Sequence, residues 1–265
     1  MRDSERHYVD LLFSATNKYG SWDPEIPVQC GDYGRITQGA SSWAFWRKHR
    51  GTFLKEGNIY VDGTADKWGI PPPLDIVEDD GEGLTWITSR NAIERDLSGD
   101  INGDIGALAN CSLKVSFKIS SGSAAVLVME NEATTLIDPP AKLLPLLEDH
   151  EMQGRVIVSQ THRCSSYARL LTAQGDSNVT VGLNATALTD GPASAQTMAK
   201  WVRSTAGGYF KSRINRTGKR SFYPLFKLVS VKQEAISVGL RGESDEQELP
   251  DAIPPWLTQS TSPSK

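Results

Sequence analysis

Residues 110–120 alternate strictly between polar and apolar side chains, and this pattern constrains the fold more than any other feature of the chain. The odd positions are all apolar and the even positions are all polar. Period-two alternation predicts an extended strand with one apolar and one polar face. The pattern recurs over residues 178–187, where valine, leucine and alanine alternate with asparagine, threonine and glycine.

Strands of this kind suit two settings. Most of them lie in a half-buried antiparallel sheet, which is the ordinary interpretation. A tilted strand of about 9–11 residues also crosses the hydrocarbon core of a bilayer. In that second setting, the residues predicted to face lipid are Leu113, Val115, Phe117, Ile119, Val179, Val181 and Leu183.

Both alternating strands belong to longer extended regions. A weaker strand pattern begins at Leu84, and a polar stretch rich in Gly and Asp follows it, so residues 84–119 are predicted to form a long hairpin. Gly122 breaks the strand, and the apolar run over residues 124–129 predicts a buried strand. A second hairpin is predicted within residues 156–187, with its turn at residues 174–177.

Composition is that of a globular chain of 265 residues, 38% of them hydrophobic. No window approaches the roughly 18 consecutive apolar residues of a spanning helix. The three widely spaced cysteines predict free thiols in a reducing compartment and no zinc site. The N-terminus lacks the apolar core of a signal peptide. We therefore expect a cytosolic protein with one domain, residues 1–232, and an acidic, Pro/Ser-rich tail, residues 233–265.

One short segment places large aromatic side chains beside cations. Tryptophan prefers the headgroup level of a membrane, and each cation near an anionic surface contributes about 1 kcal/mol. The same composition stacks on nucleic-acid bases, and in the plainest interpretation the aromatics are simply buried. We favour a lipid surface. The predicted lipid contacts in this segment are Trp43, Phe45, Trp46, Arg47, Lys48 and Arg50.

Charge is unevenly distributed toward the C-terminus. Residues 191–233 contain nine Lys or Arg and no Asp or Glu, and an acidic stretch follows. This arrangement suggests an anionic partner or an intramolecular mask, and two solvated faces account for it equally well. The further predicted lipid contacts are Lys211, Arg213, Arg216, Lys219 and Arg220.

The sequence carries none of the phosphate-binding, dinucleotide-binding, zinc-protease or serine-hydrolase motifs. His162 and Cys164 lie two residues apart, but nothing specific supplies the third group that a nucleophilic pair needs. We expect no catalytic residue, no metal and no cofactor. The enzymatic alternative is a small α+β hydrolase whose site is assembled from distant residues.

Several segments, in this order and spacing, resemble fungal gasdermin-like proteins of the regulator-of-cell-death and heterokaryon-incompatibility group. They are residues 19–27 (YGSWDPEIP), 31–35 (GDYGR), 56–60 (EGNIY), 156–167 and 223–226 (YPLF). The resemblance spans about residues 6–232.

The resemblance implies an α+β fold, a twisted and mostly antiparallel sheet with flanking helices like the gasdermin N-terminal domain, convertible to a large membrane β-barrel. It implies a non-enzymatic pore-former of lytic, pyroptosis-like cell death that binds acidic phospholipids and forms a homo-oligomer. By position, the inserting hairpins would be residues 84–119 and 156–187. The first helix, predicted over residues 6–19, and the aromatic-basic loop would contact the membrane.

The C-terminus departs from animal gasdermins, which carry a bulky repressor domain. Among fungal relatives, a protease removes a short tail in some, and an incompatible variant of the same protein activates others without cleavage, as in allorecognition. Both triggers stay open for this chain. We expect the inactive protein in the cytoplasm and the active protein at the plasma membrane or another anionic membrane. The rival from the binding class is a non-inserting module that binds nucleic acid or a lipid surface, although we expect no nucleic-acid partner.

Overall fold

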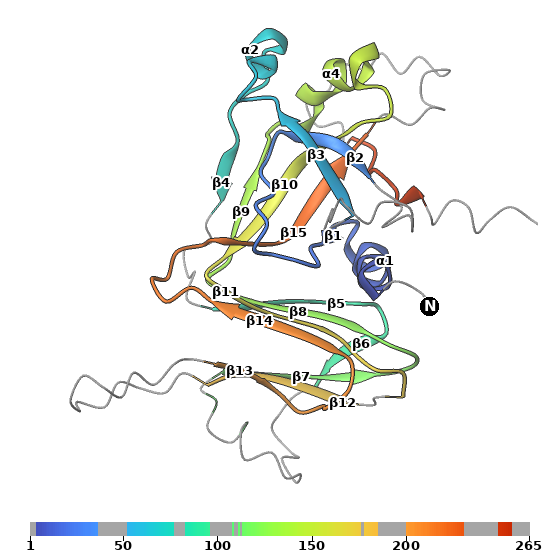
Figure 1. Cartoon of the computed structure of the whole chain (residues 1–265), viewed down its shortest axis with the longest axis vertical. Coiled ribbons are helices and arrows are strands. Elements are labelled where there is room, and N and C mark those ends of the chain that lie inside the picture. The colour runs from blue at the N-terminus through green and yellow to red at the C-terminus, as the bar shows by residue number, and fades with distance from the viewer. Residues whose placement is uncertain are drawn as a thin grey trace, which may run out of the picture. The chain divides into compact units, whose positions relative to one another are not determined.

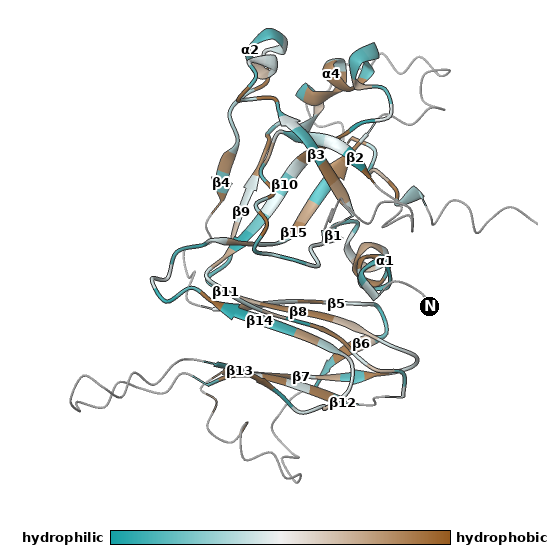
Figure 2. Ribbon diagram, in the orientation of Figure 1, coloured by the Kyte–Doolittle hydropathy of each residue, from teal (hydrophilic) through white to brown (hydrophobic). Residues whose placement is uncertain are grey.

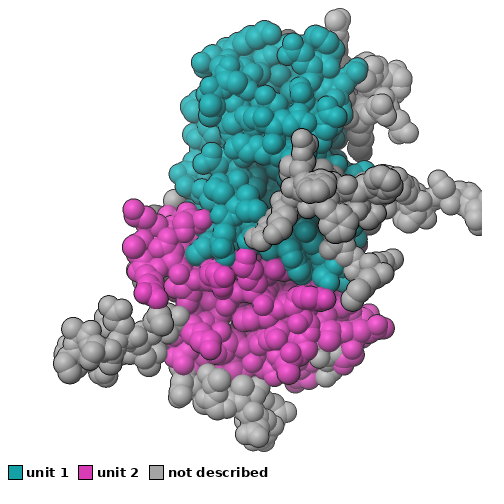
Figure 3. Space-filling view, in the orientation of Figure 1, with its two compact units in different colours: residues 1–79, 133–163, 222–265 teal, residues 80–132, 164–221 magenta. Residues whose placement is uncertain are grey.

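The computed structural model describes residues 4–36, 52–76, 83–95, 108, 111, 113–175, 178–184, 200–230 and 249–255. Over these residues the chain is an α+β structure with mostly antiparallel strands and few helices (Figure 1). It divides into two compact units (Figure 3). Unit 1 consists of residues 1–79, 133–163 and 222–265, and unit 2 of residues 80–132 and 164–221. Unit 2 is therefore made of two insertions into the chain of unit 1. The predicted domain boundary at residue 232 lies outside the described residues.

Unit 1 contains a seven-stranded sheet with β10 at its centre. β15 pairs with one edge of β10, and β2 and β9 pair with successive parts of its other edge. The strands are β1 (Tyr19–Gly20), β2 (Asp32–Ile36), β3 (Phe53–Asn58), β4 (Leu74–Ile76), β9 (Ala133–Leu136), β10 (Val156–Cys164) and β15 (Phe222–Val229). The helical elements are α1 (Ser4–Thr16), α2 (Thr64–Trp68), η1 (Pro140–Leu143), α4 (Leu144–Glu148) and η2 (His150–Met152).

The first helix is confirmed, and α1 packs its apolar face into a core of unit 1 that includes Tyr19 and Phe226. It ends before the predicted residue 19. Asn17 adopts a left-handed backbone conformation with a φ of 56°, and its N–H donates to the Phe13 carbonyl, which closes the last helical turn.

Part of the tail belongs to unit 1. Leu249 is buried in one hydrophobic cluster of this unit and Ala252 in another. The Ala252 N–H donates to a β15 carbonyl at 2.9 Å, and Asp251 forms an ion pair with Lys227 at 3.2 Å. Residues 249–255 are thus a docked segment, although their sequence carries no strand or helix pattern.

Unit 2 is a sandwich of two four-stranded sheets (Figure 1). One sheet has the order β14-β11-β8-β5 and the other β13-β12-β7-β6. The strands are β5 (Leu84–Thr88), β6 (Ala92–Arg95), β7 (Leu113–Ile119), β8 (Ala125–Glu130), β11 (Ser166–Leu171), β12 (Asn178–Asn184), β13 (Lys200–Arg203) and β14 (Tyr209–Ile214). Residues from both sheets, including Phe117, Val128, Leu170 and Trp201, form one shared core.

Candidate functional site

The first insertion is one antiparallel hairpin folded back on itself. β5 pairs with β8, from Leu84↔Glu130 to Thr88↔Val126. β6 pairs with β7, the preceding part of the same returning chain, at Ala92↔Ile119. The predicted hairpin of residues 84–119 is confirmed. Its returning strand extends beyond the predicted end and continues through β8 to Glu130.

The second insertion has the same design. β11 pairs with β14, and β12 pairs with β13 (Figure 1). The prediction of a hairpin within residues 156–187 is wrong, because β10 pairs with strands of unit 1 and β11 does not pair with β12. The turn that the sequence indicated near residues 174–177 falls between β11 of one sheet and β12 of the other. β11 and β12 each find their hairpin partner further along the chain.

The two hairpins pair with each other through their inner strands in one continuous register. β8 pairs with β11, from Glu130↔Ser166 to Ala125↔Leu171, and β7 pairs with β12, beginning at Lys118↔Asn178. Between Ala125 and Lys118 the first chain advances by as many residues as the second does between Leu171 and Asn178. The two inner strands therefore stay in register across the bend.

The bend contains glycines in backbone conformations that other residues rarely adopt. Gly122 has a φ of 64°, Gly175 of 99° and Gly208 of 75°. A Cβ on Gly208 would lie 2.2 Å from the Leu171 carbonyl oxygen, whereas a Cβ on Gly122 would meet nothing within 4 Å. Glycine is thus required at position 208 both by the close contact and by the positive φ. At position 122 it is required by the positive φ alone.

Polar side chains hold the corners. The Asn91 amide donates to the carbonyls of Ser121 (2.5 Å) and Ser123 (3.0 Å). The Ala124 N–H donates to the Thr172 hydroxyl at 2.8 Å, and the Thr172 N–H donates to the Ala124 carbonyl at 2.9 Å. This last pair continues the register of the inner strands into the bend.

The predicted lipid-facing residues lie where the alternation placed them, on one face of β7 and β12. Figure 2 colours these strands by the hydropathy of each residue. That face is turned into the sandwich core. Leu113, at the end of β7, is 36% exposed, and the other six are 0–5% exposed. On the opposite face of these strands, the Ser116 and Thr180 hydroxyl oxygens lie 2.9 Å apart. In this structure the apolar face follows the ordinary interpretation.

A chain of polar groups crosses the sandwich. The Trp201 indole N–H on β13 donates to the Ser166 hydroxyl on β11 at 3.2 Å. The Ser166 hydroxyl in turn donates to the Glu130 carboxylate on β8 at 2.7 Å. The indole and the serine are both buried, at 2% and 0% exposure. The sequence carried no signal for this contact, since the three residues come from distant segments.

The aromatic-basic segment from Trp43 to Arg50 lies outside the described residues. The second basic group lies in unit 2. Lys211 and Arg213 are on the outer strand β14, and Arg216 and Lys219 follow it. Lys211 is directly opposite Arg169 of β11, so two like charges are neighbours on this sheet.

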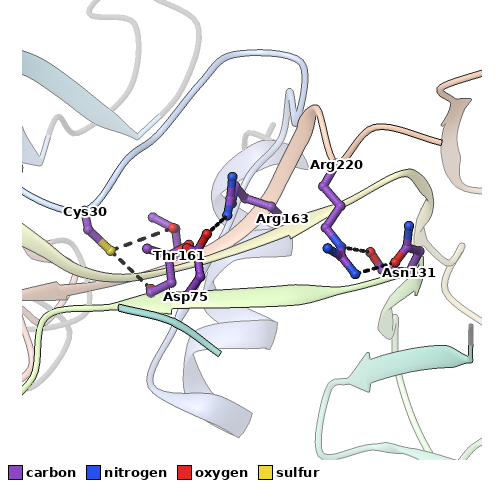
Figure 4. Close-up of polar contacts among 7 residues, drawn as sticks. Cys30, Asp75, Asn131, Thr161, Arg163 and Arg220 are labelled. Carbon is purple, nitrogen blue, oxygen red and sulfur yellow. Dashed lines mark hydrogen bonds and ion pairs between the residues drawn. The ribbon is translucent and has the colours of Figure 1, made fainter. Parts of the chain in front are cut away.

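Arg220 differs from these cations because it makes a fixed structural contact. Its Nε donates to the Asn131 backbone carbonyl at 2.9 Å, and its Nη2 donates to the Asn131 side-chain oxygen at 2.6 Å (Figure 4). Asn131 follows β8 directly and has a φ of 53°. Arg220 therefore links the end of the first insertion to the end of the second.

The thiols are unsuited to nucleophilic chemistry. All three cysteines are free and buried. Burial raises the pKa of the Cys30 thiol to about 11 and raises that of Cys164 further. His162 is engaged through both ring nitrogens, with Lys18 Nζ at 2.8 Å and Thr134 Oγ1 at 3.1 Å. Neither residue of the Cys–His pair is thus arranged as a nucleophile with its base.

Another ionic contact stabilises an outer strand of unit 1. Asp75 of β4 accepts from Thr135 Oγ1 at 2.6 Å and from Arg163 Nη2 at 2.8 Å (Figure 4).

No group of three or more His, Cys, Asp or Glu suited to a metal ion occurs in the part of the chain that the structure describes.

Comparison of the chain with protein-family models, with curated proteins and with solved structures finds no match. Within the described ranges, none of the helices has the length and apolar character needed to span a membrane.

Proposed function

We propose that the chain is a non-enzymatic pore-forming protein whose two folded hairpins straighten and insert into an anionic membrane. The observation that supports this function best is the continuous register of the inner strands. Because the register of the inner strands is the same on both sides of the bend, β7–β8 and β11–β12 can straighten into one long ladder that retains every pair between these inner strands.

The straightened ladder would be amphipathic. Side chains alternate along a strand, so all odd-numbered residues of both inner strands come to one face. On that face, Phe117 would sit opposite Val179 and Ala125 opposite Leu171. The other face would carry the polar pairs Ser116–Thr180 and Lys118–Asn178 in its distal half. In the distal half of the ladder, one face thus suits lipid and the other suits water. In the half near the base both faces are apolar, since Val128 and Leu170 lie on the second face.

One cation, Arg169, lies on the apolar face, and the insertion model must explain where it would lie in a membrane. Arg169 pairs with Leu127, close to the base of the hairpins at Glu130↔Ser166. The ladder is longer than the roughly 9–11 residues that cross the hydrocarbon core, so its base extends beyond that core. Arg169 would therefore lie at headgroup level, where arginine interacts favourably with phosphate.

Straightening also explains the proposed homo-oligomer. A flat ribbon of two hairpins has outer strands, β5–β6 and β13–β14, each with an edge that must be paired within a membrane. Neighbouring copies would supply these partners around a ring. Anionic lipid would be bound first by the exposed basic residues, each cation contributing about 1 kcal/mol.

This function agrees with what the resemblance to fungal gasdermin-like proteins implies, a role in lytic cell death and allorecognition. On this proposal the protein is cytoplasmic until a protease or an incompatible variant of the same protein activates it. It then acts at the plasma membrane or another anionic membrane.

Two neighbouring serines give a direct test. Ser120 and Ser121 are both exposed in the folded-back structure, so either one tolerates substitution. In the straight ladder Ser121 lies on the lipid face and Ser120 on the opposite face. An arginine facing lipid near mid-bilayer costs about 2–4 kcal/mol per subunit. We expect Ser121→Arg to abolish dye release from anionic liposomes and Ser120→Arg to retain it, with equal liposome binding by both.

Equal dye release by the two arginine variants would contradict the insertion model. This pair is preferable to charges at Val115 or Phe117, because those side chains are buried in the core and their replacement would unfold unit 2. A lack of release by the unmodified protein from both anionic and neutral liposomes, under every activation condition, would favour the non-inserting lipid- or nucleic-acid-binding module.

A further inference from the structure

We infer that Trp201, Ser166 and Glu130 form a latch that keeps the hairpins folded back and so sets the threshold for insertion. This inference concerns the regulation of the proposed pore and rests on that proposed function. Trp201 belongs to the distal half of the second hairpin, where it pairs with Leu183. Ser166 and Glu130 pair with each other at the base of the two hairpins.

The latch exists only while the hairpins are folded. In a straight ladder Trp201 would lie beside Leu183, and Ser166 lies 17 positions along the same strand from Leu183. At about 3.3 Å per residue, the indole and the serine would then be roughly 56 Å apart. The indole–serine hydrogen bond therefore cannot form in the straightened ladder.

The rest of the polar chain survives straightening. Ser166 and Glu130 are directly opposite each other in the inner ladder, and the hydroxyl–carboxylate bond of 2.7 Å depends only on that pairing. The carboxylate polarises the serine hydroxyl, which strengthens its acceptance of the indole N–H. The base is thus a permanent anchor, and the indole N–H is the part that is released.

The position of the latch makes it effective. Trp201 is 2% exposed within the core shared by both sheets, so its bond is protected from competition by water. A tryptophan N–H that is buried needs a partner, which Ser166 supplies only in the folded-back state. Opening the sandwich removes both the packing of the ring and the bond of its N–H.

Replacing tryptophan by phenylalanine separates the bond from the packing. Trp201→Phe deletes the donor and retains an aromatic ring in the core. Trp86→Phe is the matched control, because Trp86 lies in the same unit and is 37% exposed. Ser166→Ala is a second variant, which deletes the acceptor at the other end of the bond.

Hydrogen exchange without membranes measures the latch itself. We expect amide exchange in β12 and β13 to be about five-fold faster in Trp201→Phe and in Ser166→Ala than in the unmodified protein or in Trp86→Phe. Unchanged exchange in both latch variants, with normal folding by circular dichroism, would overturn the latch.

Dye release measures its regulatory role. With phosphatidylcholine vesicles containing phosphatidylserine, we expect release by Trp201→Phe to be about five-fold faster than by the unmodified protein and by Trp86→Phe. Faster exchange with an unchanged release rate would overturn the regulatory role and leave the pore in place. Faster exchange without release by any variant would overturn the pore instead.

Discussion

At the scale of single residues, two neighbouring cations of this chain have different roles. The fact that both side chains are basic does not show which role each one has. Lys219 and Arg220 were predicted together as lipid contacts. Arg220 makes two hydrogen bonds to Asn131, whereas Lys219 is exposed in the segment after β14. A cation whose donors are committed within the protein has less to offer a lipid phosphate. The basic segment therefore divides into structural and surface positions.

Alanine substitution of the two neighbours tests this division. We expect Arg220→Ala to lower the free energy of unfolding by about 1–3 kcal/mol, because two hydrogen bonds from a charged donor are lost. Lys219→Ala should leave stability unchanged and weaken sedimentation with anionic liposomes, by about 1 kcal/mol of binding free energy. Denaturant titration of both variants measures the change in stability, and liposome sedimentation measures the change in lipid binding. An equal loss of stability in the two would contradict the assigned roles.

At the scale of elements, the sequence predicted correctly which face of a strand is apolar. It predicted poorly which strands pair with each other. The alternation in β7 and the apolar run in β8 are confirmed, since each depends on local pattern. The second hairpin was misassigned because pairing is decided between distant segments, and two strands joined by a short turn need not pair. β13 is a short strand whose Trp201 pairs with Leu183 of β12. Such tertiary contacts decide the structure where local strand preference is weak.

The bend at Gly122 provides an element-scale prediction. At a φ of 64°, alanine costs about 1–2 kcal/mol even though its Cβ has room. In a straight strand that cost disappears. We therefore expect Gly122→Ala to lower the stability of unit 2 by about 1 kcal/mol and to speed dye release.

Gly83 is the matched control for this substitution. It belongs to the same unit, has open space around it, and has no positive φ. Gly83→Ala should therefore leave both thermal unfolding and release close to those of the unmodified protein. If the two alanine variants behaved alike, backbone strain at the bend would have no part in controlling straightening.

At the scale of the whole molecule, the docked tail segment changes how the C-terminus is interpreted. The sequence suggested an acidic mask over the basic segment. Of the acids in that stretch, Asp251 forms an ion pair with Lys227 on β15, and the others, Glu243 to Glu248, lie outside the described residues. Leu249 and Ala252 fill the cores of unit 1. Removal of the tail would therefore affect the stability of unit 1 as well as any masking.

Two truncations separate these effects. A chain that ends at residue 255 keeps the docked segment, and a chain that ends at residue 248 loses it. We expect the shorter chain to lose about 2–4 kcal/mol of stability, since a buried leucine contributes about 1.5–3 kcal/mol and backbone hydrogen bonds are also lost. The longer chain should match the full chain in denaturant titration. Equal stability of the two truncated chains would show that the segment is not part of the fold.

The order in which the chain is synthesised gives the inserted topology of unit 2 a further consequence. β7 and β8 leave the ribosome well before β11 and β12, and the residues of unit 1 that include β9 and β10 lie between them in the sequence. Until the second insertion emerges, the first has an apolar face with Phe117 at its centre and an unpaired strand edge. Such surfaces bind chaperones or associate with other chains. The sheets of unit 2 cannot be completed until β14 has been made, so the part of the molecule proposed to harm membranes stays incomplete while most of the chain is being synthesised.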